Sequence, residues 1–367
     1  MKKVKFSECV EYMIKGPFGS DMKKSLYVPR GENTYKVYIQ GNAIQKDQSL
    51  GDYYVSNSYF HEKLERFEVH PGDYIITCDG TLGKYIKLDE NIERGVISSS
   101  LLLLKLKDTV IYDKYFELFW EYSMLGYLAS QARNACLVHL PSAKVIGDVE
   151  ILLPDLKYQI EFADRAFLVH SIIEKRTEEL TLLDDLIKAR FVEMFVSKNY
   201  PREELDSLSF GKGEYGAQSA SVEYDPNRPR YVRITDINDD GSLNEDYVCS
   251  SNIEDDETYK LTYGDFCFAR MGATVGKTYA YKSGNQIFAG YLIRYKLRLD
   301  KIIPEYLYEF TRLDEYWNWV LLNQSGAAQP GINAKKYGSL MVPVAPLGEQ
   351  QKFTEFVKQV DKSKVVT

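Results

Sequence analysis

The order of apolar and polar positions divides the chain into strand-rich and helical stretches. Short alternating or continuous apolar runs, bounded by turn-forming residues, predict strands within 35–44, 65–77, 95–107 and 230–243. The second range reads as two strands around the Pro71-Gly72 turn, and the third reads as one long strand. Residues 112–132 and 302–324 have helical spacing and composition. Strands followed by a helical segment therefore occur twice along the chain.

A different pattern fills residues 155–195, which contain neither Gly nor Pro. Apolar residues recur every seven positions there, and this spacing predicts one long helix that packs along another helix. Asp155 stands where an N-cap residue is expected. The seam of the predicted pairing consists of Ala166, Ile173, Leu180, Leu183, Ile187 and Met194. The last 20 or so residues restart the same pattern.

The chain also contains one phrase twice. "GDYIITCDGTLGK" begins at Gly72, and "GDFCFARMGATVGK" begins 192 residues later at Gly264. Further matches keep an offset of 191, from Lys105 and Lys296 to Gln159 and Gln350 and beyond. Upstream, "GPFGS" at 16–20 is aligned with "GEYGA" at 213–217, at an offset of 197. A period this long indicates two copies of one domain rather than a solenoid.

The repeated phrase resembles a phosphate-binding loop only superficially. Such a loop needs four residues between its first Gly and the Gly-Lys-Ser/Thr that follows. Two residues separate Gly80 from Gly83, and three separate Gly272 from Gly276. The phrase is better explained as a hairpin, with a Gly-Asp turn before a strand and a Gly-containing turn after it.

Composition limits the function classes. The chain has 367 residues, 29 of them Tyr, and a net charge of −7, which argues against a simple polyanion binder. Its five Cys and four His are scattered, so neither a metal site nor a disulfide framework is indicated, and no cofactor is expected. The start "MKKVKFSE" has no apolar signal sequence, and no run has the length of a membrane span. A cytoplasmic protein is expected.

The chain has the order module, long helix, module, short helix. It also contains the motifs "PGDYIIT", "YVRITDI" and "NQSGAAQPGINAKKYGSLMVPVAPLGEQQKF". In this order and in these motifs it resembles the specificity (S) subunit of type I restriction–modification enzymes. The resemblance implies an α+β fold with two similar strand-rich target recognition domains, joined by long antiparallel coiled-coil helices in a pseudo-two-fold arrangement. The corresponding ranges are 1–154 for the first domain, 155–197 for the central helix, 198–345 for the second domain and 346–367 for the C-terminal helix.

The same resemblance implies a non-catalytic subunit of a prokaryotic, cytoplasmic complex. Each domain would read one half of a bipartite site in double-stranded DNA, while methyltransferase (M) and restriction (R) subunits would supply the chemistry. The sequence agrees, since it contains neither a Gly-rich loop for S-adenosylmethionine nor an Asn-Pro-Pro-Tyr motif. Alternatives are a protein–protein scaffold or an accessory subunit of another restriction–modification type.

Candidate DNA-binding residues are polar or basic side chains in the predicted loops, because Arg suits guanine and Asn or Gln suits adenine. In the first module they are Ser20, Lys23, Lys24, Gln40, Asn42, Thr81, Lys84 and Arg133. In the second module they are Tyr215, Gln218, Ser219, Arg233, Thr235, Arg270, Thr274, Lys277, Gln324 and Gln329.

The second predicted helix is shorter than the first and can cover only the distal half of the seam. The other half, with Phe162, Ala166, Phe167, Val169 and Ile173, should then lie bare. Because burial of a large apolar side chain is worth about 1.5–3 kcal/mol, a partner chain is expected to cover it. That partner would be either a second copy of this chain or a methyltransferase subunit; alternatively, the chain is a shortened allele with impaired assembly.

Overall fold

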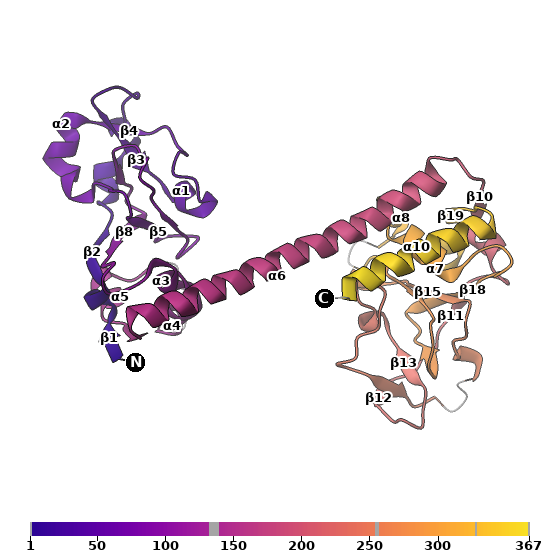
Figure 1. The fold of residues 1–367 in the computed structure, drawn as a ribbon. Coiled ribbons are helices and arrows are strands. Elements are labelled where there is room, and N and C mark those ends of the chain that lie inside the picture. The colour runs from indigo at the N-terminus through magenta and orange to yellow at the C-terminus, as the bar shows by residue number, and fades with distance from the viewer. Residues whose placement is uncertain (1, 132–138, 254–256, 327–328, 366–367) are drawn as a thin grey trace. The chain divides into compact units, whose positions relative to one another are not determined.

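The structure, a computed structural model, describes residues 2–131, 139–253, 257–326 and 329–365 (Figure 1). The chain divides into unit 1, Met1–Glu174, and unit 2, Lys175–Thr367. Helix α6 (Leu156–Phe191) is continuous, beginning in unit 1 and ending in unit 2. Strand-rich units and one long helix confirm the expected fold class. None of the helices within the described ranges is long and apolar enough to cross a membrane.

Unit 1 is built on an antiparallel sheet with the strand order β2-β8-β5-β6. A second sheet has the order β4-β3-β7, in which β3 and β7 run parallel, and β1 pairs with β9. The strands are β1 (Lys2–Lys5), β2 (Val10–Lys15), β3 (Thr34–Tyr38), β4 (Tyr54–Ser56), β5 (Tyr74–Thr77), β6 (Tyr85–Lys87), β7 (Gly95–Ile97), β8 (Leu101–Leu106) and β9 (Glu150–Leu153). The helices are α1 (Gln40–Gln45), α2 (Asn57–Tyr59), α3 (Asp113–Phe119), α4 (Leu125–Gln131) and α5 (Ala143–Gly147), with the π-helical turn η6 (Trp120–Met124) joining α3 to α4.

Unit 2 has the same plan, with the sheet order β11-β18-β15-β16, the parallel pair β13-β17 and the antiparallel pair β10-β19. The strands are β10 (Arg202–Glu204), β11 (Glu214–Tyr215), β12 (Ser221–Glu223), β13 (Arg230–Val232), β14 (Cys249–Ser251), β15 (Asp265–Ala269), β16 (Thr278–Ala280), β17 (Gln286–Phe288), β18 (Leu292–Lys296) and β19 (Met341–Pro343). The helices are α7 (Pro304–Thr311), α8 (Asp314–Asn323), α9 (Ala334–Gly338) and α10 (Leu347–Val365), and the π-helical turn η7 (Val192–Val196) follows α6.

The strand register confirms the internal repeat. Tyr74 lies opposite Leu104 in unit 1, and Phe266 lies opposite Tyr295 in unit 2. These pairs reproduce the offsets of 192 at the first strand and 191 at the second. The hairpin predicted from the repeated phrase is therefore present twice, as β5-β6 and as β15-β16.

Three sequence-based element predictions were wrong in detail. Residues 65–67 form a 3₁₀ turn rather than a strand, and only Glu68 bridges to Val96. The long strand predicted at 95–107 is split into β7 and β8 by residues 98–100, because the two halves pair in different sheets. The helical segment at 302–324 is split at Arg312, which ends α7.

The upstream alignment of the two copies also needs correction. Lys15 pairs with Leu102, and Tyr215 pairs with Ile293, so Gly16 corresponds to Gly216 at an offset of 200. A Cβ on Gly16 would lie 2.1 Å from the Ser98 carbonyl oxygen, and a Cβ on Gly216 would lie 2.3 Å from that of Ala289. Both positions exclude a side chain because the backbone passes so close.

The glycines of the repeated phrase serve the hairpin. Gly83 and Gly276 have φ of 72° and 93°, a region that favours glycine, and each lies against the helical segment that covers the sheet. The Trp120 indole donates a hydrogen bond to the Gly83 carbonyl, and the Tyr316 hydroxyl donates one to that of Gly276. The phrase thus fastens the hairpin to the helices of its unit.

In unit 2, the end of α6 packs antiparallel against α10 (Figure 1). Phe353 near the start of α10 lies against Phe191 and Phe195, with ring centroids 5.3 and 5.4 Å apart. Of the predicted seam residues, Ile187 and Met194 are buried in this core, Leu183 packs against it, and Leu180 is half-buried. Asp155 caps α6 by accepting a hydrogen bond from the Tyr158 amide at 2.9 Å, as predicted.

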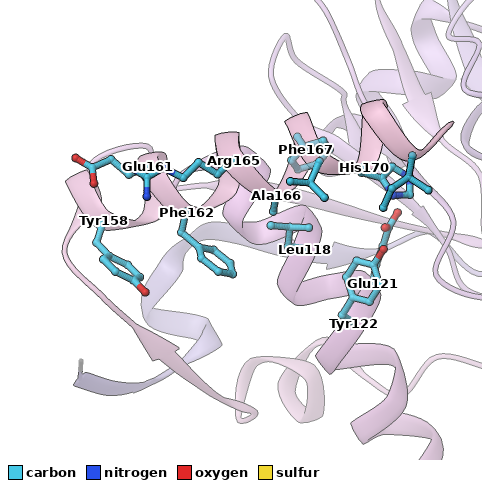
Figure 2. A pocket seen from close by; sticks show the side chains of 12 residues that line it. Leu118, Glu121, Tyr122, Tyr158, Glu161, Phe162, Arg165, Ala166, Phe167 and His170 are labelled. Atoms are coloured by element: carbon cyan, nitrogen blue, oxygen red, sulfur yellow. The ribbon is translucent and has the colours of Figure 1, made fainter. Parts of the chain in front are cut away.

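The remaining part of the seam lies in unit 1 and is more exposed. Ile173 is 57% exposed and Ala166 is half-buried. Phe162 and Val169, also predicted to lie bare, are 48% and 55% exposed. Phe162 and Ala166 lie at an open hollow between α6 and α3 (Figure 2). The part of the seam in unit 1 is thus more exposed than the part that packs near α10, although Phe167, also predicted to lie bare, is half-buried.

Candidate nucleic-acid interface

Unit 2 contains an open cavity of about 450 Å³ that brings together four of the predicted DNA-binding residues. Its walls come from three segments: residues 217–221, residues 231–235 after the start of β13, and residues 289–291 after β17. Since β13 and β17 are parallel, the segments that follow them emerge at the same edge. The predicted residues that line the cavity are Gln218, Ser219, Arg233 and Thr235.

The aromatic side chains of this cavity differ in their roles. Tyr231 is buried, and its hydroxyl donates to the carbonyl oxygens of Ala217 at 2.7 Å and Ser219 at 3.1 Å. Tyr231 therefore holds the loop that carries Gln218 in place. Tyr291, in contrast, is 54% exposed and presents its ring to solvent beside Gln218.

Arg233 is held rigidly at the edge of the cavity. Its guanidinium donates to both carboxylate oxygens of Asp236 and to the Tyr247 carbonyl at 3.1 Å. The hydrogen bonds that Arg233 donates to Asp236 raise the pKa of Arg233 above its ordinary value, so the side chain stays charged. The Asp236 carboxylate compensates that charge, which weakens the attraction of Arg233 for a phosphate.

A second group of predicted residues lies beside this cavity. The Arg270 guanidinium stacks over the Tyr215 ring, 4.8 Å from its centroid, and the Tyr215 hydroxyl accepts a hydrogen bond from the Ala334 amide. The Arg270 amide donates to the Tyr291 carbonyl at 2.9 Å. Arg270 and Tyr215 therefore continue the surface that begins at the cavity.

The other predicted residues of unit 2 surround the loop between α8 and α9. The Gly272 amide donates to Pro330 O, and the Ile332 amide donates to Arg270 O, so this loop lies against the turn before β16. The residues placed there are Thr274, which is half-buried, Gln324, which ends α8, and the exposed Gln329. Lys277 is the exception among them, since its ammonium group pairs with Asp239 at 2.6 Å.

In unit 1 the predicted residues are spread over three places. Ser20, Lys23 and Lys24 are exposed in the turns that follow β2, and Gln40 begins α1. Thr81 and Lys84 are exposed in the turn between β5 and β6. Arg133 lies outside the described residues.

Asn42 does not fit a base-reading role, so its prediction as a DNA-binding residue was wrong. The side chain is fully buried, and its carbonyl oxygen accepts from the Ile39 amide at 2.7 Å. Its amide group donates to the carbonyls of Asp47 and Leu50. With both N–H donors and the carbonyl oxygen engaged inside unit 1, Asn42 stabilises the start of α1 instead. Asp236 accepts from the Arg233 amide in the corresponding turn of unit 2.

Two exposed aromatic residues, one in each unit, were missed by the sequence analysis. Because Gly16 corresponds to Gly216, Phe18 occupies the place that Gln218 occupies in unit 2, and Phe18 is 82% exposed. The second is Tyr291. For Phe18 the available signal was its position two residues after Gly16. The sequence alignment at an offset of 197 concealed this signal, because it did not match Gly16 with Gly216.

Comparison with known families gives an independent reading of unit 2. Residues 213–366 match the model of the type I restriction modification DNA specificity domain. No curated protein matches the chain.

Solved structures match the fold over nearly the full length. One is a chain from a structure that describes complex assembly and conformational transition of the type I R-M system; it shares 14% identity with this chain at a TM-score of 0.54. The type I restriction–modification S subunit from M. genitalium shares 15% identity at a TM-score of 0.56. Each match covers 99% of this chain and 90% of the other. Residues 213–366 are thus similar to the type I restriction modification DNA specificity domain, and the chain has, over nearly its full length, the fold of these two solved structures.

Proposed function

We propose that this chain is the DNA-recognition subunit of a type I restriction–modification enzyme. Each unit reads one half of a bipartite site, and the complex carries methyltransferase and restriction subunits to that site. One observation carries the proposal: unit 1 repeats the four-stranded sheet, the parallel strand pair and the antiparallel terminal pair of unit 2, and residues 213–366 of unit 2 match the DNA specificity domain. A chain with two such units has two readers for two half-sites.

The boundaries of the readers follow from the repeat. We place the first target recognition domain at 1–154 and the second at 198–345, with the central helix at 155–197 and the C-terminal helix at 346–367. In unit 2, the reading surface is the cavity with Gln218, Thr235 and Tyr291, continued by Arg270. Gln suits the edge of adenine and Arg that of guanine, while exposed aromatic rings add contact area.

Charge supports a reader that works within a complex. The chain is acidic overall, and two basic candidates of unit 2 are neutralised by Asp236 and Asp239. Phosphate contacts dominate DNA affinity, so the isolated chain should bind DNA weakly. The methyltransferase subunits would close round the duplex and add basic surface. The chain itself would be non-catalytic and, like its complex, cytoplasmic.

The same acidity favours a second candidate, a protein–protein scaffold whose units dock partner proteins. Salt separates the two functions. DNA recognition predicts an affinity of the assembled complex that falls steeply as salt rises. A scaffold predicts no measurable DNA affinity in that complex.

The test of DNA reading uses single substitutions in the cavity of unit 2. The chain is assembled with its methyltransferase subunits, and methylated sites in a randomised DNA library are sequenced. Gln218→Ala and Thr235→Val should relax or change one half of the methylated motif and leave the other half intact. The control is Asn285→Ala, an exposed residue at the opposite end of the β13-β17 pair, which should preserve both halves. A motif that is unchanged by Gln218→Ala and Thr235→Val together would refute this reading surface.

A further inference from the structure

Backbone hydrogen bonds join the three segments that wall the cavity of unit 2. The Gly216 amide donates to the Leu292 carbonyl at 3.2 Å, which ties the start of the first segment to the end of the third. The Ala289 amide donates to the Val232 carbonyl at 2.9 Å, which ties the third segment to the second. These two bonds form a frame that sets the positions of the three walls relative to one another.

Unit 1 contains the same frame. The Gly16 amide donates to the Leu101 carbonyl at 2.8 Å, and the Ser98 amide donates to the Tyr38 carbonyl at 2.9 Å. The strand registers of the two units align these donors and acceptors with those of unit 2, pair by pair. The segments of unit 1 that correspond to the three cavity walls are residues 17–21, 37–41 and 98–100.

The side chains on the frame differ between the units. In unit 2, Gln218 stands on the first segment and the exposed Tyr291 stands on the third. In unit 1, Phe18 and Ser100 occupy these two places. Each unit thus combines one exposed aromatic ring with one polar side chain, but the two kinds of side chain have exchanged segments.

The backbone that carries Phe18 is held in place, although the ring itself is 82% exposed. Phe18 precedes a 3₁₀ turn (Gly19–Met22), and its carbonyl accepts from the Asp21 amide at 2.8 Å. Met22 is buried, and the Tyr59 hydroxyl donates to the Asp21 carbonyl at 3.0 Å. Because the ring stands on an ordered turn, little conformational entropy is lost when it meets a partner.

The charge beside Phe18 suits a partner that carries phosphates. Lys23 and Lys24 follow the same turn and are exposed. Within the described part of the chain, neither of them forms an ion pair with a carboxylate. In unit 2, by contrast, Asp236 neutralises Arg233. Unpaired lysines next to a reading segment attract the phosphates that position a protein on DNA.

The chemistry of a phenylalanine limits what it can read. Its ring can recognise only an apolar group on a base edge, and in the major groove only thymine presents one, the C5 methyl group. Against the polar edge of guanine or adenine, the ring would remove hydrogen-bonding groups from water without replacing their partners. A phenylalanine in the place of Gln218 therefore favours thymine where the glutamine suits adenine.

We propose that Phe18 is a specificity-determining residue of unit 1, and that its ring contacts the C5 methyl group of one thymine in the half-site that this unit reads. Lys23 and Lys24 attract the neighbouring phosphates. The proposal rests on the DNA recognition proposed above and adds to it a residue of unit 1 and the base that this residue reads.

The first test uses deoxyuridine, which differs from thymidine only in lacking that methyl group. The motif of the chain assembled with its methyltransferase subunits is determined first, and the half that Gln218→Ala leaves intact is assigned to unit 1. Each thymine of this half, on either strand, is then replaced in turn by deoxyuridine, and binding of the complex is measured. One replacement should weaken binding about fourfold, the effect of one buried methyl-sized group. The same replacement should not affect a complex that contains Phe18→Ala.

The second test follows the motif itself. Phe18→Ala should relax the preference for thymine at one position of the unit 1 half and leave the other half intact. Phe18→Leu, which keeps an apolar side chain, should retain part of that preference. The control is Tyr127→Ala, an exposed aromatic residue on α4 outside the frame, which should change neither half. Circular dichroism checks that the variants fold.

The outcomes separate this proposal from the proposed function. A bipartite motif that Phe18→Ala leaves unchanged would overturn the role of Phe18 while DNA recognition stands. So would equal binding of the thymidine and deoxyuridine duplexes at every position of the unit 1 half. An unsubstituted complex without any sequence preference would instead contradict DNA recognition, and the role of Phe18 with it.

Discussion

Gln159 and Gln350 make the same three hydrogen bonds in the two units. The Gln159 side chain accepts from the Tyr112 amide and donates to the carbonyls of Val110 and Pro154. The Gln350 side chain accepts from the Ile303 amide and donates to the carbonyls of Lys301 and Ala345. Both glutamines are fully buried. Each ties the start of a helix, α6 or α10, to the segment that leads into the helices of its unit.

This relationship predicts paired stability effects. Gln159→Ala should destabilise unit 1, and Gln350→Ala should destabilise unit 2, each by about 2–3 kcal/mol, because buried backbone groups lose their partners. Hydrogen exchange followed by mass spectrometry locates the loss within each unit. Gln351→Ala, at an exposed neighbouring position, serves as the control and should change little. Equal loss of protection in both units from either substitution would contradict the independent roles.

Asn42 provides a prediction that distinguishes stability from recognition. Asn42→Ala should lower the melting temperature of the chain, because the start of α1 and the carbonyls of Asp47 and Leu50 lose their partners. Gln40→Ala, two positions earlier and only half-buried, should leave the melting temperature nearly unchanged. Scanning calorimetry of the two variants makes the comparison. An Asn42→Ala variant as stable as the unsubstituted chain would show that its buried bonds contribute nothing.

Glu309 gives unit 2 a pH dependence. Burial raises the pKa of its carboxyl to about 7, although Arg312 lies 3.2 Å away and opposes the shift. The folded unit thus keeps a proton that the unfolded chain releases near pH 4.5, so Glu309 contributes stability at low pH that is lost as pH rises towards 7. Between pH 5 and 7.5 we expect the loss to be on the order of 1–3 kcal/mol.

Denaturant unfolding at several pH values checks this expectation in the unsubstituted chain and in Glu309→Gln. The difference in stability between the two proteins should change with pH between about 4.5 and 7, since glutamine does not titrate. A difference that stays constant across that range would show that Glu309 does not carry the raised pKa.

The central helix yields a prediction about spacing. Four residues inserted after Glu174 would add about 6 Å to α6 and leave its contacts with α10 intact. We expect the preferred gap between the two half-sites to lengthen by one or two base pairs, at about 3.4 Å each. The same insertion between the exposed residues Asn227 and Arg228 is the control and should not alter the gap. An unchanged gap after the first insertion would mean that α6 does not set the spacing.

The repeat, the hairpins and the long helix could be predicted because each leaves a local or periodic signal in the sequence. The split between β7 and β8 could not, since the serines at 98–100 are compatible with one continuous strand and only the sheet pairing assigns the two apolar runs to different sheets. The role of Asn42 was hidden for a similar reason, because a buried asparagine and a base-reading one look alike without their neighbours. Phe18 was missed because the correct offset of 200 depends on a strand register that only the fold reveals.

The most direct test of the account is the methylation pattern that this chain confers. The chain and its methyltransferase subunits are expressed in a host without other DNA methylation, and the modified genome is sequenced. The account predicts one motif with two defined halves separated by a fixed stretch of undefined bases, since two units read the two halves. A single uninterrupted motif would contradict the two-reader model, and an absence of sequence-specific methylation by the assembled complex would contradict DNA recognition itself.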